Sequence, residues 1–121
     1  MKIERFEEID AWKNSRALVN SIYRICAIGK FKKYYSLTDQ IRRAAISIIA
    51  NISEGFARKG TKEFIQFLFI SKSSAAELQS HLYIACDQNY ITRDAFDELY
   101  KEAVIIQRQL SNFIKYLQTT L

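Results

Sequence analysis

Proline is absent from this 121-residue chain, and glycine occurs only three times. Sheet-rich domains need many tight turns, which these two residue types supply, so their scarcity predicts few turns and long helices. Long apolar runs are also missing, because none approaches the roughly 20 residues that a membrane-spanning helix needs. The charged start, MKIERFEEID, lacks the apolar core of an export signal. We therefore expect a cytoplasmic protein with no membrane partner.

Residue types that carry chemistry are also few. His81 is the only histidine, and Cys26 and Cys86 stand far apart on apolar segments. Zinc needs three or four suitably spaced ligands, and the Glu-x-x-His pairs of di-iron bundles do not occur. Neither glycine-rich phosphate-binding motif is present. We therefore expect no enzyme, no metal site and no cofactor, with His81 at the surface or an interface and both cysteines as small core residues.

Apolar periodicity predicts four helices, at about 7–28, 37–57, 62–87 and 93–118. Gly29 is expected to end the first helix, and Ser36 to cap the start of the second. Short linkers force neighbouring helices to run antiparallel, which predicts one all-α domain over residues 1–121, an up-down-up-down antiparallel four-helix bundle. The alternative is a helical hairpin pair that completes its core only by dimerising. The fourth helix carries a heptad seam, formed by Phe96, Leu99, Ala103, Ile106, Leu110, Phe113 and Leu117.

The third predicted helix has more apolar surface than one bundle needs. Beside its core face it carries a second stripe, formed by Ile65, Phe69, Ala76 and Tyr83. A monomer that exposed so much contiguous apolar surface would tend to aggregate. The stripe therefore predicts a homo-oligomer with this helix in the interface, and the alternative is an unusually wide core face.

Positive charge is concentrated in one part of the chain. The net charge is +5, but residues 24–62 hold nine basic and only two acidic residues, a local charge of +7. The rest of the chain is net negative, at −2. Such a local excess suggests an anionic partner, although a solvated charged face is the commoner meaning of any single residue.

Two clusters account for most of this charge. The first contains Lys30, Lys32 and Lys33 in GKFKKYYS, with Arg42 and Arg43 a little further along. These cations could pair with phosphates while the neighbouring aromatic rings stack on bases, or the rings could fold back and cap the end of the bundle. The second cluster contains Arg58, Lys59 and Lys62, of which the first two could instead offset the negative end of the helix dipole. An up-down bundle places the two clusters about 30 Å apart.

A polar stripe runs along the second predicted helix into the stretch NISEGFARKGTKE. It includes Gln40, Asn51 and Glu54, and the last of these precedes Arg58 by four residues, which permits an ion pair if the helix continues. Gly55 would permit either a close helix crossing or the loss of helical geometry. Our hypothesis is that these residues are mainly structural or interfacial.

The segment 37–78 resembles the four-helix bundle family of 23S rRNA intervening-sequence proteins. The resemblance extends over nearly the whole chain, and its Asn-x-x-Glu-Gly signature is fairly specific. This sequence departs from the family pattern at Ile49, where a proline is frequent, and at Ser73, where a glycine is frequent. The matching residues are Leu37, Gln40, Arg43, Ala44, Ser47, Ile48, Asn51, Ile52, Glu54, Gly55, Arg58, Phe64, Phe67, Leu68, Ser74, Glu77 and Leu78.

This resemblance implies a four-helix bundle that assembles as a homopentamer and has no enzymatic activity. The family is also similar to the accessory variability protein of diversity-generating retroelements, a basic pentameric barrel that binds nucleic acid and a reverse transcriptase. From the charge pattern, the apolar stripe and this resemblance together, we predict a non-enzymatic oligomer that binds nucleic acid, RNA more than DNA, with weak sequence specificity. The alternative is a protein–protein interaction scaffold with a polypeptide partner.

Overall fold

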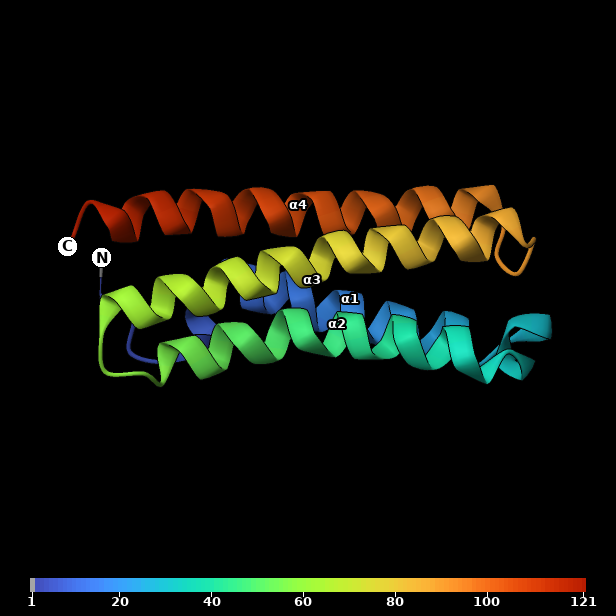
Figure 1. The fold of residues 1–121 in the computed structure, drawn as a ribbon, viewed down its shortest axis with the longest axis horizontal. Helices are drawn as coiled ribbons and strands as arrows, with labels where there is room; N and C mark the ends of the chain where they lie inside the picture. Colours follow the sequence, from blue (N-terminus) through green and yellow to red (C-terminus); the bar gives the residue numbers. More distant parts are fainter. Residues whose placement is uncertain (1) are drawn as a thin grey trace.

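A computed structural model describes residues 2–121 and contains four long helices, which pack side by side (Figure 1). The helices are α1 (Asp10–Cys26), α2 (Tyr35–Phe56), α3 (Thr61–Asp87) and α4 (Arg93–Gln118). Each helix contacts its neighbours in the chain, and α4 also packs against α1, which closes the bundle. Within the described residues there are helices and no strands. The predicted all-α, up-down-up-down four-helix bundle is therefore confirmed.

Two short 3-10 helices, η1 (Phe6–Glu8) and η2 (Gly29–Lys33), adjust the predicted boundaries. The first helix was expected to begin near residue 7 and to end at Gly29, but α1 is shorter. Gly29 instead begins η2 with φ of +59°, a backbone conformation that glycine adopts without steric cost. The prediction of Ser36 as the N-cap was also wrong, because α2 already begins at Tyr35 and the N-cap residue is Tyr34.

The core is apolar along the whole length of the bundle. Each helix contributes side chains with no exposed area, such as Leu18, Ile48, Leu78 and Ile106. Among the described residues, every buried side-chain nitrogen or oxygen has a hydrogen-bond partner. At roughly 25 cal/mol per Å² of apolar area removed from water, this continuous core is the main source of stability.

The α2–α3 contact includes a polar seam beside the core. The Ser71 hydroxyl donates to the backbone carbonyl of Ile48 at 2.6 Å, and the hydroxyls of Ser47 and Ser74 lie 2.7 Å apart. The Asn51 amide donates to the Ser47 carbonyl at 2.8 Å. The two bonds between the helices fix the register of α2 against α3, because a shift by one residue would break them together.

Gly55 lies where α2 approaches α3 closely. A Cβ atom at this position would stand 2.6 Å from the Cβ of Phe67 and 2.9 Å from a ring carbon of Phe64. Of the two roles considered for this glycine, the structure shows a close helix crossing, since α2 continues through it to Phe56. The predicted pair between Glu54 and Arg58 is present, at 3.7 Å.

Candidate nucleic-acid interface

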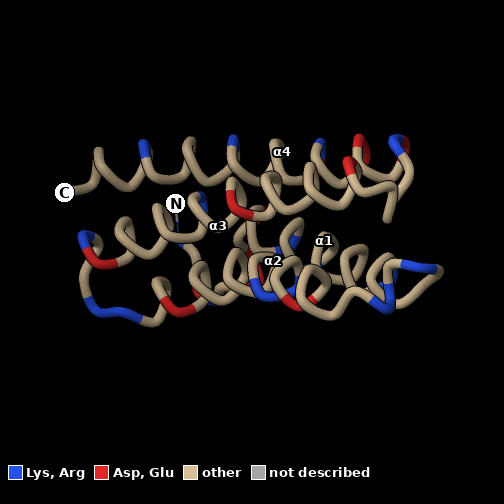
Figure 2. The backbone as a smooth tube through the Cα atoms, turned by 45° about the vertical axis from the view of Figure 1, so that its right-hand side comes forward, with Lys and Arg blue, Asp and Glu red and all other residues tan. Residues whose placement is uncertain are grey.

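The basic residues expected to bind an anionic partner lie at both ends of α2 and along it (Figure 2). We name Lys30, Lys32 and Lys33 on η2 the turn cluster, and Arg58, Lys59 and Lys62 around the α2–α3 connection the loop cluster. Both clusters are exposed to solvent. Because α2 has 22 residues, the clusters are separated by about 33 Å at ~1.5 Å per residue.

The turn cluster carries charge that no carboxylate neutralises within the part of the chain that the structure describes. Its three lysines are exposed and form no ion pair there. They stand immediately before the N-terminus of α2, where unpaired backbone N–H groups add a partial positive charge. The three lysines and this helix terminus together favour an anion beside the turn cluster.

Arg42 and Arg43 continue the basic surface into α2, but with different surroundings. The Arg42 guanidinium lies over the ring of Tyr23, 5.9 Å from its centre. Arg43 donates to Asp39 at 2.8 Å, and this hydrogen bond is the largest cause of a raised pKa for the arginine. Arg43 is thus already paired, whereas Arg42 forms no ion pair with any described residue. A hollow of about 420 Å³ between α1 and α2 is lined by Tyr23, Asp39, Arg42, Arg43, Ile46 and Ser47.

The loop cluster is partly neutralised by its own helix. Arg58 pairs with Glu54 and also lies over the ring of Phe67, 4.8 Å from its centre. Lys59 and Lys62 are exposed and form no ion pair within residues 2–121. They flank the start of α3 at Thr61, whose N-terminal backbone again favours negative charge. The charge available to a ligand here comes mainly from these two lysines.

The aromatic residues of GKFKKYYS fold back onto the bundle, with one exception. Phe31 is 1% exposed, and the rings of Tyr34 and Tyr90 stack with their centres 3.9 Å apart. Tyr35 remains 74% exposed. The capping alternative therefore describes Phe31 and one face of Tyr34, which is still 41% exposed, and Tyr35 is the ring most available to meet a base.

The outward face of α3 is apolar, but its composition differs from the prediction. Ile65 was expected at the surface, yet it is only 7% exposed, because it lies three residues before Leu68 on the core face. Phe69 and Tyr83 are about half exposed, at 46% and 50%. Ala76 is exposed as well. Sequence reasoning missed two further exposed apolar residues, Ile70 and Ile84, which directly follow Phe69 and Tyr83.

Residues with possible chemical roles are dispersed. His81 lies 3.2 Å from Glu77 on the same helix, and no metal-binding group of three or more ligands occurs among the described residues. Cys26 and Cys86 are both free thiols. Burial raises the pKa of the Cys26 thiol to about 11, against the opposing effect of Arg42, so this thiol stays protonated at neutral pH.

In the described chain, no helix has both the length and the apolar character needed to cross a membrane.

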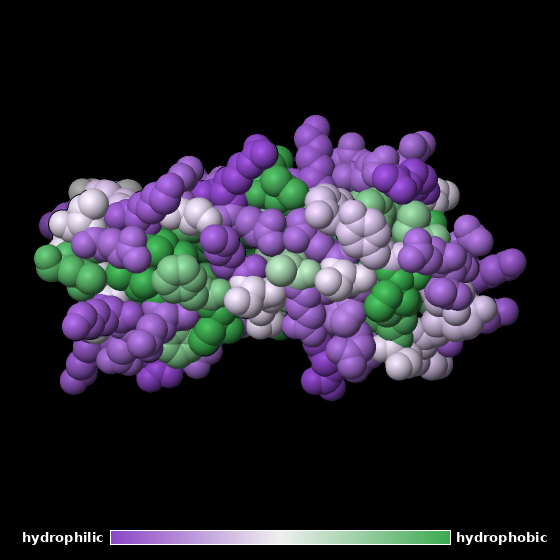
Figure 3. Space-filling model, turned by 45° about the horizontal axis from the view of Figure 1, so that its top comes forward, coloured by the Kyte–Doolittle hydropathy of each residue, from purple (hydrophilic) through white to green (hydrophobic). Residues whose placement is uncertain are grey.

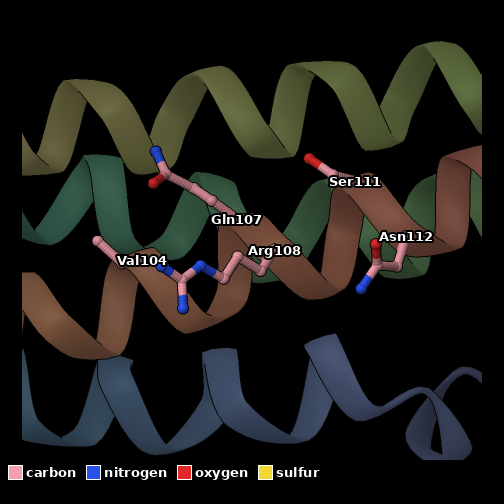
Figure 4. A pocket seen from close by; sticks show the side chains of 5 residues that line it. All are labelled: Val104, Gln107, Arg108, Ser111 and Asn112. Atoms are coloured by element: carbon pink, nitrogen blue, oxygen red, sulfur yellow. The ribbon is translucent and has the colours of Figure 1, made fainter.

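Two other hollows lie away from the turn cluster. One is lined entirely by α4, and Figure 4 shows the Gln107 side chain pointing toward α3, where it donates to Gln79 at 3.0 Å. The other, of about 600 Å³, lies between the N-terminal segment and the end of α4, with Ile3, Ile9 and Phe113 in its wall. Apolar side chains also gather on the surface at the end where the chain termini lie (Figures 1 and 3).

Comparison with known proteins gives the fold and the family. A crystal structure of a protein of unknown function from the S23 ribosomal protein family of Bacteroides thetaiotaomicron has 26% sequence identity and a TM-score of 0.79. The match covers 87% of this chain and 98% of that one. No curated protein matches the chain significantly. The sequence profile of the 23S rRNA-intervening sequence proteins matches residues 7–112, and the chain therefore belongs to that family.

Proposed function

We propose that this protein is a non-enzymatic, oligomeric helical bundle that binds nucleic acid, and RNA in preference to DNA, through the turn cluster, α2 and the loop cluster. The observation that carries the proposal is the exposed lysines at both ends of α2, which form no ion pair among the described residues. The family name, which refers to 23S rRNA, supports RNA as the ligand. We place this activity in the cytoplasm, where the free cysteines would stay reduced.

Phosphate contacts would supply most of the affinity. Each lysine that meets a phosphate releases a condensed counterion, so binding weakens as salt rises and depends little on base sequence. Arg42 would add a further contact beside the turn cluster, whereas Arg43 would first have to leave Asp39. We therefore expect Lys32 and Lys33 to contribute more than Arg43 does.

The test is fluorescence anisotropy of a labelled, structured RNA at several salt concentrations. Lys32→Glu/Lys33→Glu should weaken binding by more than about ten-fold. Adding Arg42→Glu/Arg43→Glu to that variant should weaken binding further. The matched control is Lys101→Glu/Lys115→Glu, which makes the same change in charge on α4 and should have a much smaller effect. An absence of binding at low salt, or equal effects of the test and control variants, would refute this function.

Self-association is the second part of the proposal. Phe69, Ile70, Tyr83 and Ile84 expose 46–50% of their surface on the outward face of α3, which is an economical site for contact with another copy. We propose that the assembly is a homopentamer, because the family resemblance described above implies one. Phe69→Glu should reduce the mass measured by light scattering, whereas Ile105→Glu on α4, where the residue is 40% exposed, should not. A monomeric mass for the unaltered protein would refute self-association.

The alternative function is a scaffold that binds another polypeptide through this α3 face. The same exposed apolar residues favour it. It predicts that the protein does not bind RNA at low salt, and that Phe69→Glu leaves the oligomeric mass unchanged.

A further inference from the structure

The form of nucleic acid that suits the basic surface can be inferred from its aromatic rings. Proteins that hold single strands stack successive bases on several exposed rings. Here Phe31 is buried, and one face of the Tyr34 ring is covered by Tyr90, although this residue stays 41% exposed. Tyr35 is the one largely exposed ring on the segment 29–36. One exposed ring and one half-covered ring form a poor platform for a run of successive bases, so this surface suits a single strand less well than a duplex.

The separation of the two clusters suits a double helix. They are about 33 Å apart along α2, because this helix has 22 residues. One turn of B-form DNA is about 34–36 Å long, and a turn of the A-form RNA duplex is shorter. Small domains that bind duplex RNA reach two successive minor grooves and the phosphates between them. Two groups of cations at the ends of one helix, whose long side chains can reach inward, can therefore contact backbone positions about one turn apart on a duplex.

The part of α2 between the clusters differs from its ends. Beyond Arg42 and Arg43, its outward face carries Ile46 and Ala50, which are exposed and have no charge. Such a surface would face a groove rather than phosphates, and the shallow minor groove of duplex RNA presents 2′-hydroxyl groups. α4 begins with Arg93, Asp94 and Asp97, and because Arg93 pairs with Asp97 at 3.1 Å, this helix start offers a nucleic acid no excess of positive charge.

We propose that the ligand is double-stranded RNA lying along α2, with the turn cluster and the loop cluster on its backbone about one helical turn apart. This inference rests on the proposed function and narrows it from nucleic acid in general to a duplex. Both clusters must then be occupied at once, so a ligand too short to reach both of them loses the contribution of one.

The first experiment compares three labelled probes by anisotropy in the same buffer. They are an RNA duplex of about 24 base pairs, one of about 8 base pairs, and an unstructured single strand of the longer length. The short duplex is at most about 27 Å long at ~3.4 Å per base pair, less than the separation of the clusters. The long duplex should bind more than about ten-fold more tightly than either of the other probes, because two groups of phosphate contacts form together.

The second experiment removes one cluster at a time. Lys32→Gln/Lys33→Gln and Lys59→Gln/Lys62→Gln should each weaken binding of the long duplex and reduce its salt slope by ~2, at ~1 per lost contact. Each variant should lower the affinity for the short duplex by only about two-fold, because the remaining cluster still offers a binding site. Tyr35→Ala should leave affinity for the long duplex unchanged.

The outcomes separate this inference from the function on which it rests. If none of the three probes binds, the proposed function fails. If the single strand binds as tightly as the long duplex, or if loss of the loop cluster has no effect, RNA binding stands but the duplex assignment is overturned. A duplex DNA of the same length that binds more tightly than the RNA would overturn the choice of RNA.

Discussion

Substitution of Gly55 by alanine provides a direct test of how α2 meets α3. In a helix interior, alanine is favoured over glycine by about 1 kcal/mol, so helix propensity alone predicts stabilisation. The new Cβ atom, however, would stand 2.6 Å from the Cβ of Phe67 and 3.3 Å from the backbone oxygen of Phe64. Both of these atoms are fixed to the backbone of α3, so the two helices must separate to relieve the contact.

The steric effect should be the larger one. Carbon atoms pack about 3.5–4.0 Å apart, so relief requires a shift of about 1 Å between two long helices. Overpacking of this kind costs about 1–3 kcal/mol, and a clash between backbone-fixed atoms belongs at the upper end of that range. The expected net loss is about 2 kcal/mol, which corresponds to a fall in Tm of roughly 8 °C at ~4 °C per kcal/mol.

Thermal unfolding followed by circular dichroism, at one fixed protein concentration, measures the effect. The matched control is Gly60→Ala, because a Cβ atom at Gly60 has no atom within 4 Å and the residue has φ of −110°. That variant should lose no more than about 1 kcal/mol, the cost of a poorer N-cap residue, because no steric contact is added. If Gly55→Ala melts at or above the temperature of the unaltered protein, the argument for a close crossing is wrong.

Two further variants test the seam and the electrostatics. Asn51→Ala removes the amide that donates to Ser47 and should cost about 1 kcal/mol in chemical denaturation, and an unchanged midpoint would show that the bond adds nothing. Burial and the neighbouring Glu98 raise the pKa of Glu102 above 4.5, against the opposing effect of Arg24. The stability that protonated Glu102 provides at low pH is lost as the pH rises through that raised pKa. Glu102→Gln should therefore match the unaltered protein in stability below pH 4.5 and exceed it at neutral pH.

The helices could be predicted because their apolar residues recur with helical spacing, but the core-facing residues at the helix ends could not. On α4 the heptad seam included Phe113 and Leu117, yet both are only partly buried and Ile114 is 3% exposed. A nearly straight helix has 3.6 residues per turn, so a 3.5-residue pattern drifts by ~20° per heptad. On α3, the apolar spacing likewise did not show which side of the helix faces the core, and Ile65 was therefore wrongly placed at the surface.

The basic surface was visible as local charge, but its details depend on contacts between distant residues. The Glu54–Arg58 ion pair was predicted from the four-residue spacing alone. The Asp39–Arg43 ion pair has the same spacing and could have been predicted in the same way. The stacking of Tyr34 on Tyr90 joins residues more than fifty positions apart, and no local pattern indicates it. That contact decides which rings remain available to a ligand, so the sequence left open whether the surface could stack bases.

The residues of α2 divide between two tasks according to the side on which they lie. Toward α3, Gly55 permits the close approach and Asn51 bonds to Ser47, so this part of the family signature is structural. Glu54 faces outward but pairs with Arg58, and this pair lowers the charge that a ligand would meet. Apart from Arg43 and Arg58, which are both paired with carboxylates, the residues that make the chain resemble its family are therefore not the ones on which we expect RNA to bind. That task would fall to lysines beyond both ends of the helix, where side chains can change without disturbing the packing of α2 on α3.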